Sequence, residues 1–149
     1  MPDLHGERTV EIHAPRERCH AIAADLEHAP SWQRSLVSVA ILERDAEGRP
    51  VLVDTESDAS VRTIRSRLRF RFDPPGAIAW EQERGDVKRL QGSWTFAELE
   101  PGRTRATYAL RIDPGRLLGM LLRGPAEERV RRALVDATAE GLKARAEGA

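Results

Sequence analysis

Apolar and polar residues alternate along most of the chain, which is the pattern of strands that bury one face. The first such stretch is Arg8–Pro15, in which Val10 and Ile12 share a face. From Leu36 onward the alternation returns in six segments that are separated by turn sequences, and these predict strands at about 36–43, 51–56, 64–72, 77–84, 89–99 and 104–112. Short turns join strands as hairpins, so the pattern predicts an antiparallel meander of about seven strands.

Two further segments carry helical spacing. After Pro15, the residues Cys19, Ile22 and Leu26 recur as on one face of a helix, and Pro30 ends it. A longer helix is expected from Pro125 to about Arg145. A meander with one long terminal helix predicts an α+β fold, in which a curved antiparallel sheet wraps around that helix.

The long helix has small residues on the stripe expected to face the sheet. That stripe contains Val130, Leu134, Ala137, Gly141 and Arg145, with Ala133 beside it. Two interpretations follow. Small residues leave a hydrophobic cavity between helix and sheet, or they let the helix backbone pack closely against the sheet.

The segment VRTIRSRLRFRFDPP, Val61–Pro75, has arginine at positions 65, 67, 69 and 71. Alternate residues of the neighbouring strands are acidic, at positions 54, 56 and 58 on one side and 81 and 83 on the other. Opposite charges on adjacent strands form cross-strand pairs that help to fix register. We therefore expect the arginines on the solvent face, with Arg69 opposite Glu81 and Arg67 opposite Glu83, and no nucleic-acid binding.

The same count of alternate positions predicts the inner face of the sheet. It places Trp94 beside Ile78 and Tyr108, and Trp80 between Phe70 and Gly92. Glycine within a strand often marks a close approach by another group. The wall of a hydrophobic cavity is thus expected from Leu68, Phe70, Trp80, Trp94 and Tyr108, with Ser66, Gln82, Arg62 and Arg84 as the few inward polar groups.

Composition narrows the possible partners and compartment. The chain has 149 residues, enough for one domain with a sizeable core, and its 24 basic and 24 acidic residues cancel. Zero net charge argues against a general polyanion binder. A single cysteine, Cys19, favours a reducing cytoplasm, and no leader or membrane-spanning pattern is present. We expect one domain over residues 1–149, with 1–7 as a flexible tail.

Catalytic motifs are weak. The four histidines lack metal-ligand spacing, and Cys19 and His20 are adjacent on a helix and point in different directions. No serine sits in a nucleophile elbow, and no phosphate loop is found. We expect no metal and no cofactor.

The segment Leu117–Leu122 is rich in leucine and flanked by glycines. It has too many apolar residues for one stripe of a short surface helix. It is interpreted either as a lid over the cavity, which would transiently contact a membrane or a carrier protein, or as helix packed into the core.

Taken together, VEIHAPRERCHAIAADLEHAPSWQRSLVSVAILERDAEGRP, IAWEQERG, GSWTF and TRATYALRID resemble the START-like helix-grip (SRPBCC) superfamily. The similarity is strongest to its polyketide cyclase/dehydrase and coenzyme Q-binding branch, and it spans about Thr9 to Arg145. The resemblance implies a sheet that grips the terminal helix around a hydrophobic cavity. It also implies that Trp32, in a corner with Asp25 and Pro30, lies near the cavity mouth.

Three functions remain open. The first is binding or transport of a small hydrophobic ligand that is lipid-, quinone- or polyketide-like. The second, also implied by the resemblance, is an aromatase/cyclase or dehydratase acting on a poly-β-ketone, with Tyr108 as general acid and Arg84 stabilising an enolate. Aromatase members use an inward arginine on the strand that matches Ile64–Phe72, whereas here the arginines are expected outside.

The third function is an adaptor that docks a partner or a membrane through Leu117–Leu122. The oligomeric state is left open. The predicted ligand-binding residues are Trp32, Ser66, Leu68, Phe70, Trp80, Gln82, Gly92, Trp94, Tyr108, Leu121 and Gly141.

Overall fold

Seven antiparallel strands form one sheet in the order β1-β7-β6-β5-β4-β3-β2. The structure is a computed structural model that describes residues 3–121 and 123–148, with only the backbone of Leu117 and Leu121. The strands are β1 (Leu4–Ile12), β2 (Leu36–Arg44), β3 (Pro50–Asp58), β4 (Thr63–Asp73), β5 (Ala77–Gly85), β6 (Arg89–Glu100) and β7 (Arg103–Asp113). The predicted meander is confirmed.

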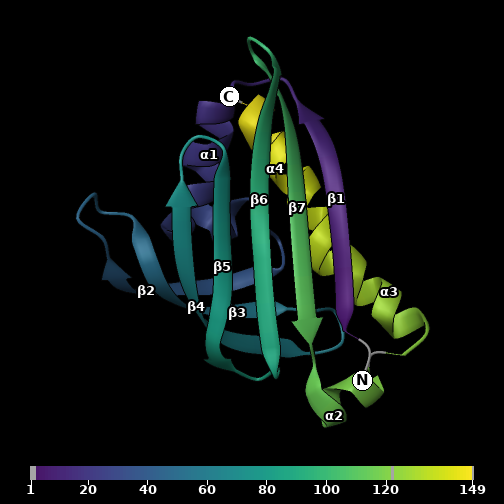
Figure 1. Cartoon of the computed structure of the whole chain (residues 1–149). Helices are drawn as coiled ribbons and strands as arrows, with labels where there is room; N and C mark the ends of the chain where they lie inside the picture. The colour runs from purple at the N-terminus through teal and green to yellow at the C-terminus, as the bar shows by residue number, and fades with distance from the viewer. Residues whose placement is uncertain (1–2, 122, 149) are drawn as a thin grey trace.

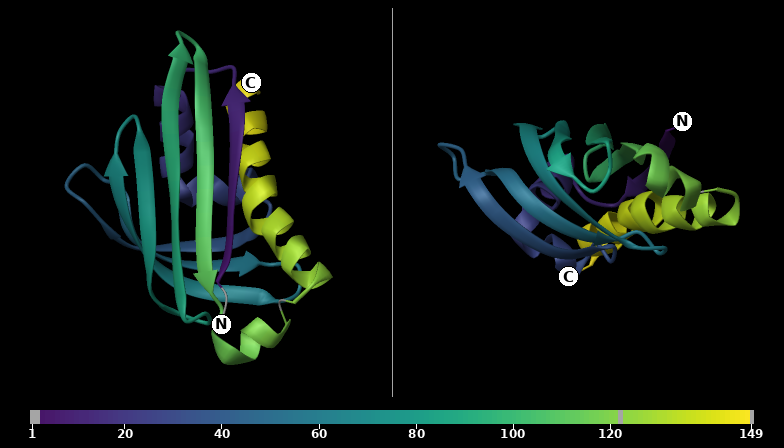
Figure 2. Two further views of the ribbon diagram at one scale, coloured as in Figure 1. Left: turned by 45° about the vertical axis from the view of Figure 1, so that its right-hand side comes forward. Right: turned by 90° about the horizontal axis from the view of Figure 1, so that it is seen from below.

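The helices lie at the two ends of the sheet and across its concave face (Figures 1 and 2). After β1 come α1 (Arg16–Ala24) and the 3₁₀ helix η1 (Leu26–Ser31). After β7 come the short α2 (Gly115–Leu121) and then one long helix, made of α3 (Pro125–Arg131), η2 (Arg132–Asp136) and α4 (Ala137–Glu147). The sheet curls around this long helix, as predicted (Figure 2). No helix among the described residues is long and apolar enough to cross a membrane.

Strand β1 begins earlier than the sequence pattern indicates. Its register pairs Leu4 with Ile112 and Glu7 with Ala109, so residues 4–7 form part of the sheet. The predicted flexible tail over 1–7 is therefore wrong for these four residues. Leu4 is buried in the hydrophobic core, and this burial stabilises the beginning of the strand.

The long helix contains one turn of π-helix at η2, and this turn changes which residues face the sheet. A π turn adds one residue to the helical repeat, so every later position is shifted by one. The buried residues of α4 are Thr138, Ala139, Leu142 and Ala146, rather than the predicted Ala137, Gly141 and Arg145. The stripe prediction holds up to Leu134 and fails after it for this reason.

Bulky aliphatic residues from both layers fill the core. Ile12, Ile78 and Ile112 on the strands and Leu142 on the helix are all less than 2% exposed. Burial of one such side chain contributes about 1.5–3 kcal/mol relative to solvent exposure. Leu142 therefore closes part of the space that a glycine stripe would have left open.

The convex face of the sheet carries the predicted charge ladder. Arg67 makes two hydrogen bonds to Asp54, with N–O distances of 2.8 and 3.1 Å. Arg65 pairs with Glu56, and Arg69 pairs with Glu43 and with Glu83. The outward orientation of these arginines is confirmed.

One register prediction on this face is wrong. Arg69 lies opposite Glu81 as expected, but Arg67 lies opposite Arg84 rather than Glu83. The register shifts between Arg67 and Leu68, so Glu83 is the extra residue of a β-bulge. The bulge also turns Arg84 to the convex face, where it lines a surface hollow with Asp54 and Arg67.

Candidate ligand-binding cavity

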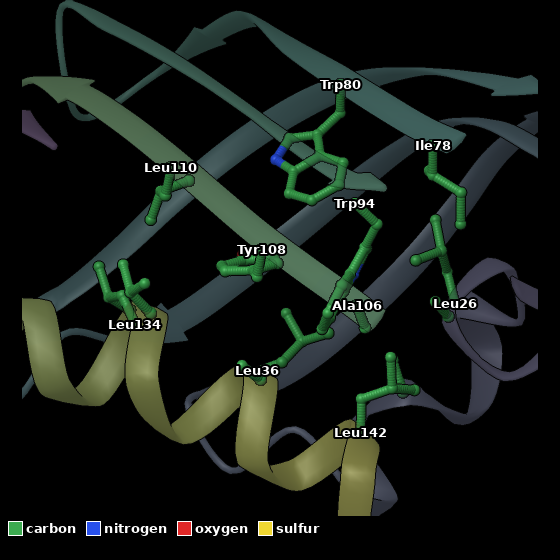
Figure 3. Packing of buried hydrophobic residues seen from close by; sticks show 14 of the residues in the cluster. Leu26, Leu36, Ile78, Trp80, Trp94, Ala106, Tyr108, Leu110, Leu134 and Leu142 are labelled. Atoms are coloured by element: carbon green, nitrogen blue, oxygen red, sulfur yellow. The ribbon is translucent and has the colours of Figure 1, made fainter. Parts of the chain in front are cut away.

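A cavity of about 80 Å³ lies between the concave face of the sheet and the long helix. Its sheet side comes from β2 to β7, and Leu134 of η2 reaches toward it from the helix (Figure 3). The residues lining it are Ala23, Leu26, Gln33, Ser35, Leu36, Val39, Val53, Thr55, Ser57, Ile64, Ser66, Leu68, Phe70, Ile78, Trp80, Leu90, Trp94, Tyr108, Leu110, Ile112 and Leu134.

Aromatic rings form a continuous series along the cavity wall. Phe70 stacks on Trp80 with a centroid distance of 5.3 Å, and Trp80 lies 5.6 Å from Tyr108. Tyr108 lies 4.7 Å from Trp94, which in turn stacks on Phe96 at 5.6 Å. The predicted neighbours are confirmed, because Trp80 pairs with Phe70 and Gly92 in the sheet and Trp94 pairs with Ile78 and Tyr108. Such a wall offers flat, polarisable surface to a ring-shaped ligand.

Tyr108 is the polar group placed at the centre of this aromatic wall. Its side chain is buried, and none of the described residues forms a hydrogen bond with its hydroxyl. Burial alone raises the pKa of the Tyr108 hydroxyl, because the low-dielectric surroundings disfavour the phenolate. The hydroxyl is therefore protonated at neutral pH and available to a ligand.

Ser66 and Gln82 form a separate hydrogen-bonded network at the strand edge. Ser66 Oγ donates to Gln82 Oε1 at 2.9 Å, and Gln82 Nε2 donates to the carbonyl of Val87 at 2.9 Å. Thr55 Oγ1 donates to the carbonyl of Ser66. Gln82 thus bonds to the turn after β5 and does not line the cavity. Ser66 does line the cavity.

Three other predicted site residues also lie outside the cavity lining. Gly92 lies behind the wall, because a Cβ atom there would be 2.4 Å from Cζ2 of Trp80. Gly141 lies against Trp32, since a Cβ atom would come within 2.6 Å of the Trp32 carbonyl oxygen. The close-packing interpretation of Gly141 is therefore the correct one, and Trp32 is a buried part of the helix contact.

The remaining predicted groups divide between the cavity and the surface. Leu68, Phe70, Trp80, Trp94 and Tyr108 line the cavity. Both predicted arginines are exposed: Arg62 precedes β4, and the bulge turns Arg84 outward. The side chain of Leu121 lies outside the part of the chain that the structure describes.

The leucine-rich segment is only partly buried. Leu118 is 8% exposed and Met120 is 65% exposed, so helix α2 both packs on the core and presents an apolar side chain to solvent. The side chains of Leu117 and Leu121, and residue 122 as a whole, lie outside the described part.

Several lining residues were missed. On β3 the acidic residues alternate with Val53, Thr55 and Ser57. The alternation that places the acidic side chains on the solvent face therefore also predicts that these three face the cavity. Gln33 and Ser35 lie in the irregular segment before β2, where no periodic pattern exists to indicate a direction.

Cys19 and His20 do not form a catalytic pair. Cys19 is fully buried, and burial raises the pKa of its thiol. His20 Nε2 lies 3.1 Å from the carbonyl oxygen of Ala77, and its ring meets Phe96 edge-on. Burial lowers the pKa of the His20 imidazole, so His20 is a neutral core residue.

Comparison with known proteins now places this fold and cavity in a family. Residues 12–139 match the model of the family described as polyketide cyclase/dehydrase and lipid transport. The chain belongs to that family. The match includes strands β2 to β7 and only the last residue of β1.

A curated relative is similar to part of this chain. The granaticin polyketide synthase bifunctional cyclase/dehydratase of Streptomyces violaceoruber is 32% identical over 107 residues, which are 69% of this chain and 32% of the relative. The chain thus spans about a third of that relative's length.

Solved structures agree on the START-like helix-grip fold. A START superfamily protein from Mycobacterium smegmatis superposes with a TM-score of 0.82 at 20% identity, covering 96% of this chain and 97% of that one. The Zhui aromatase/cyclase from Streptomyces sp. R1128 gives 0.76 at 22% identity, covering 98% and 94%. At these identities the likeness establishes the fold alone.

Proposed function

We propose that this protein binds or transports a small hydrophobic ligand in the cavity between sheet and helix, without transforming it. The observation that carries the proposal is the cavity lining, which combines an aromatic wall with few polar groups. Apolar surface with a small number of polar groups is the usual composition of a small-molecule site. The single cysteine, buried at position 19, suits a reducing cytoplasm as the place of action.

The position of the arginines favours binding over catalysis. Arg84, the candidate for enolate stabilisation, lies on the convex face, and Arg65, Arg67 and Arg69 lie there too. An enolate needs a donor or a cation within hydrogen-bond distance of its oxygen. Tyr108 is present in the cavity without a charged partner among the lining residues.

The alternative function is a polyketide cyclase or dehydratase. It is favoured by the 32% identity to a bifunctional cyclase/dehydratase. In that case Tyr108 would donate a proton to a carbonyl of a poly-β-ketone.

The cavity volume implies that ligand entry requires side chains to move. Its volume of about 80 Å³ is well below the about 300–1,000 Å³ of sites for drug-sized ligands. Leu36 and Leu134 lie between the aromatic wall and the helix, and their rotation would enlarge the cavity (Figure 3).

Native mass spectrometry of the purified protein, before and after organic extraction, tests the proposal. We expect a stoichiometric extra mass that extracts into solvent and is recovered unchanged after it is returned to the protein. Recovery of the ligand with one water lost would instead support the dehydratase or cyclase.

A pair of helix variants tests whether the ligand occupies this cavity. Leu134→Trp adds bulk at the lining, whereas Ala133→Trp adds the same group at a half-exposed neighbouring position. The extra mass should disappear from the first variant and remain in the second. An extra mass that persists in a folded Leu134→Trp protein would place the ligand elsewhere.

A further inference from the structure

The cavity lining contains no arginine, lysine, aspartate, glutamate or histidine among the described residues. A carboxylate or ammonium group taken from water into such a site loses its hydration and gains no partner of opposite charge. That transfer is strongly unfavourable for an unpaired ion. The lining therefore selects against charged ligands, including those with an acidic head group.

The hydroxyl of Tyr108 has no hydrogen-bond partner among the described residues and is free to bind a ligand. Trp80 and Trp94 flank its ring at centroid distances of 5.6 and 4.7 Å, and the side chain is 5% exposed. None of the described residues forms a hydrogen bond with this hydroxyl, and its oxygen is not among the fully buried unpaired polar atoms, so a small molecule in the cavity can reach it. A protonated phenol has one O–H that it can donate. An acceptor oxygen on the ligand would satisfy it.

The other buried polar side chain on this part of the wall is already engaged. Ser66 Oγ donates its proton to Gln82 Oε1, and Gln82 Nε2 is held by the carbonyl of Val87. Ser66 therefore has no proton left to donate to a ligand. Ser35 lies in the segment before β2 and Ser57 lies on β3, and both strands are distant from β7, which carries Tyr108, in the strand order.

We propose that the ligand is an uncharged ring compound with a carbonyl-type oxygen, and that Tyr108 is the residue that orients it by donating a hydrogen bond to that oxygen. The inference rests on the proposed ligand-binding function and adds the charge and the polar group of the ligand. The indole rings of Trp80 and Trp94, which flank Tyr108, would contact the ring of the ligand on either side of the hydrogen bond.

Three probes that share one ring system test this proposal: 2-acetonaphthone, 2-ethylnaphthalene and 2-naphthoate. They differ in having a neutral carbonyl, no oxygen, or a carboxylate. Dissociation constants from tryptophan fluorescence quenching should rank the ketone tightest and the carboxylate weakest. A carboxylate that binds as tightly as the ketone would overturn the proposal.

Tyr108→Phe removes the hydroxyl and keeps the ring. We expect this variant to bind the ketone about five- to tenfold more weakly and the hydrocarbon equally well, which is the usual loss for one neutral hydrogen bond. Thr95→Val, which removes an exposed hydroxyl from β6, should leave both constants unchanged. Equal ketone affinity in wild type and Tyr108→Phe would overturn the role of Tyr108.

Stability measurements separate an orienting role from a structural one. Because the hydroxyl of Tyr108 has no partner among the described residues, Tyr108→Phe should not lower the free energy of unfolding of the ligand-free protein. A co-purified ligand that carries a carboxylate would refute this inference and leave the proposed function intact. Failure of all three probes, with no co-purified mass, would refute both.

Discussion

The two faces of strand β4 show how one sheet serves two different environments. Ser66, Leu68 and Phe70 line the cavity, while Arg67 and Arg69, at the alternate positions, form ion pairs on the convex surface. The arginines of β4 thus lie on the convex side of the sheet, opposite its cavity-lining residues. The inner face can be uncharged because the outer face provides solubility.

The two faces also differ in how much they stabilise the fold. Each buried aliphatic or aromatic side chain contributes about 1.5–3 kcal/mol, whereas an exposed ion pair contributes about 0–1 kcal/mol. The outer pairs nevertheless restrict the register of β3 with β4, because Asp54 lies opposite Arg67 and Glu56 opposite Arg65. The inner face therefore contributes most of the stability, and the ion pairs of the outer face favour one register of β3 with β4.

Gly92→Leu should have the largest effect on this contrast, because it adds bulk directly behind the aromatic wall. A Cβ atom at position 92 would lie 2.4–2.6 Å from three atoms of the Trp80 indole, so Trp80 must move into the cavity. We expect a loss of about 1–3 kcal/mol in the free energy of unfolding, as is typical of overpacking. Ligand uptake should be abolished in the folded variant, measured by urea titration and native mass spectrometry.

Gly76→Leu is the matched control for this change. A Cβ atom at position 76, in the turn between β4 and β5, meets nothing within 4 Å. That variant should keep its stability and its ligand. Unchanged ligand uptake in Gly92→Leu would show that the ligand does not depend on the position of Trp80.

Lowering the pH should protonate His20, a buried histidine on α1 that contacts Ala77 and Phe96 of the sheet. The pKa of His20 is lowered in the folded protein by burial, so the unfolded chain binds its proton more readily. The free energy of unfolding should therefore be constant above the unfolded pKa of about 6.5 and fall as the pH decreases below it. Urea titrations between about pH 8 and about pH 5 would measure this decline.

Two histidine variants identify the group responsible. His20→Gln removes the titration and should flatten the decline below about pH 6.5, although it is less stable at neutral pH because the contact with Phe96 is lost. His28→Gln changes an exposed histidine and should leave the decline in place. If the decline persisted in His20→Gln, another group would be responsible.

The difference between the faces also explains what could be predicted from sequence. Strict alternation predicted the sheet, the outward arginines and the neighbours of Trp80 and Trp94, because side-chain direction in a regular strand depends only on parity. The predictions failed where an inserted residue breaks a repeat. The bulge at Glu83 turned Arg84 outward, and the π turn at η2 moved Leu142 inward in place of Gly141.

The cavity itself was predicted for a partly wrong reason. Gly141 does not create space, since it lets the helix backbone approach Trp32. The space lies beside Leu134, and it is bounded by Gln33 and Ser35 from a segment without periodicity. No pattern in the sequence shows how an irregular segment folds back over a sheet, so these residues could be found only from tertiary structure.

The smallest predicted effect is on the outer face, at the pair Asp54 and Arg67. The hydrogen bonds from Arg67 hold the pKa of Asp54 below its ordinary value, so the pair stabilises the fold above the unfolded pKa of aspartate, and this contribution is lost as the pH falls through the lower folded pKa. Asp54→Asn should cost less than about 1 kcal/mol at neutral pH, with no difference from wild type in strong acid. A double-mutant cycle with Arg67→Gln would isolate the pair, and ligand affinity should stay unchanged in every variant. A loss as large as that of Gly92→Leu would show that the charged face contributes to stability as much as the core does.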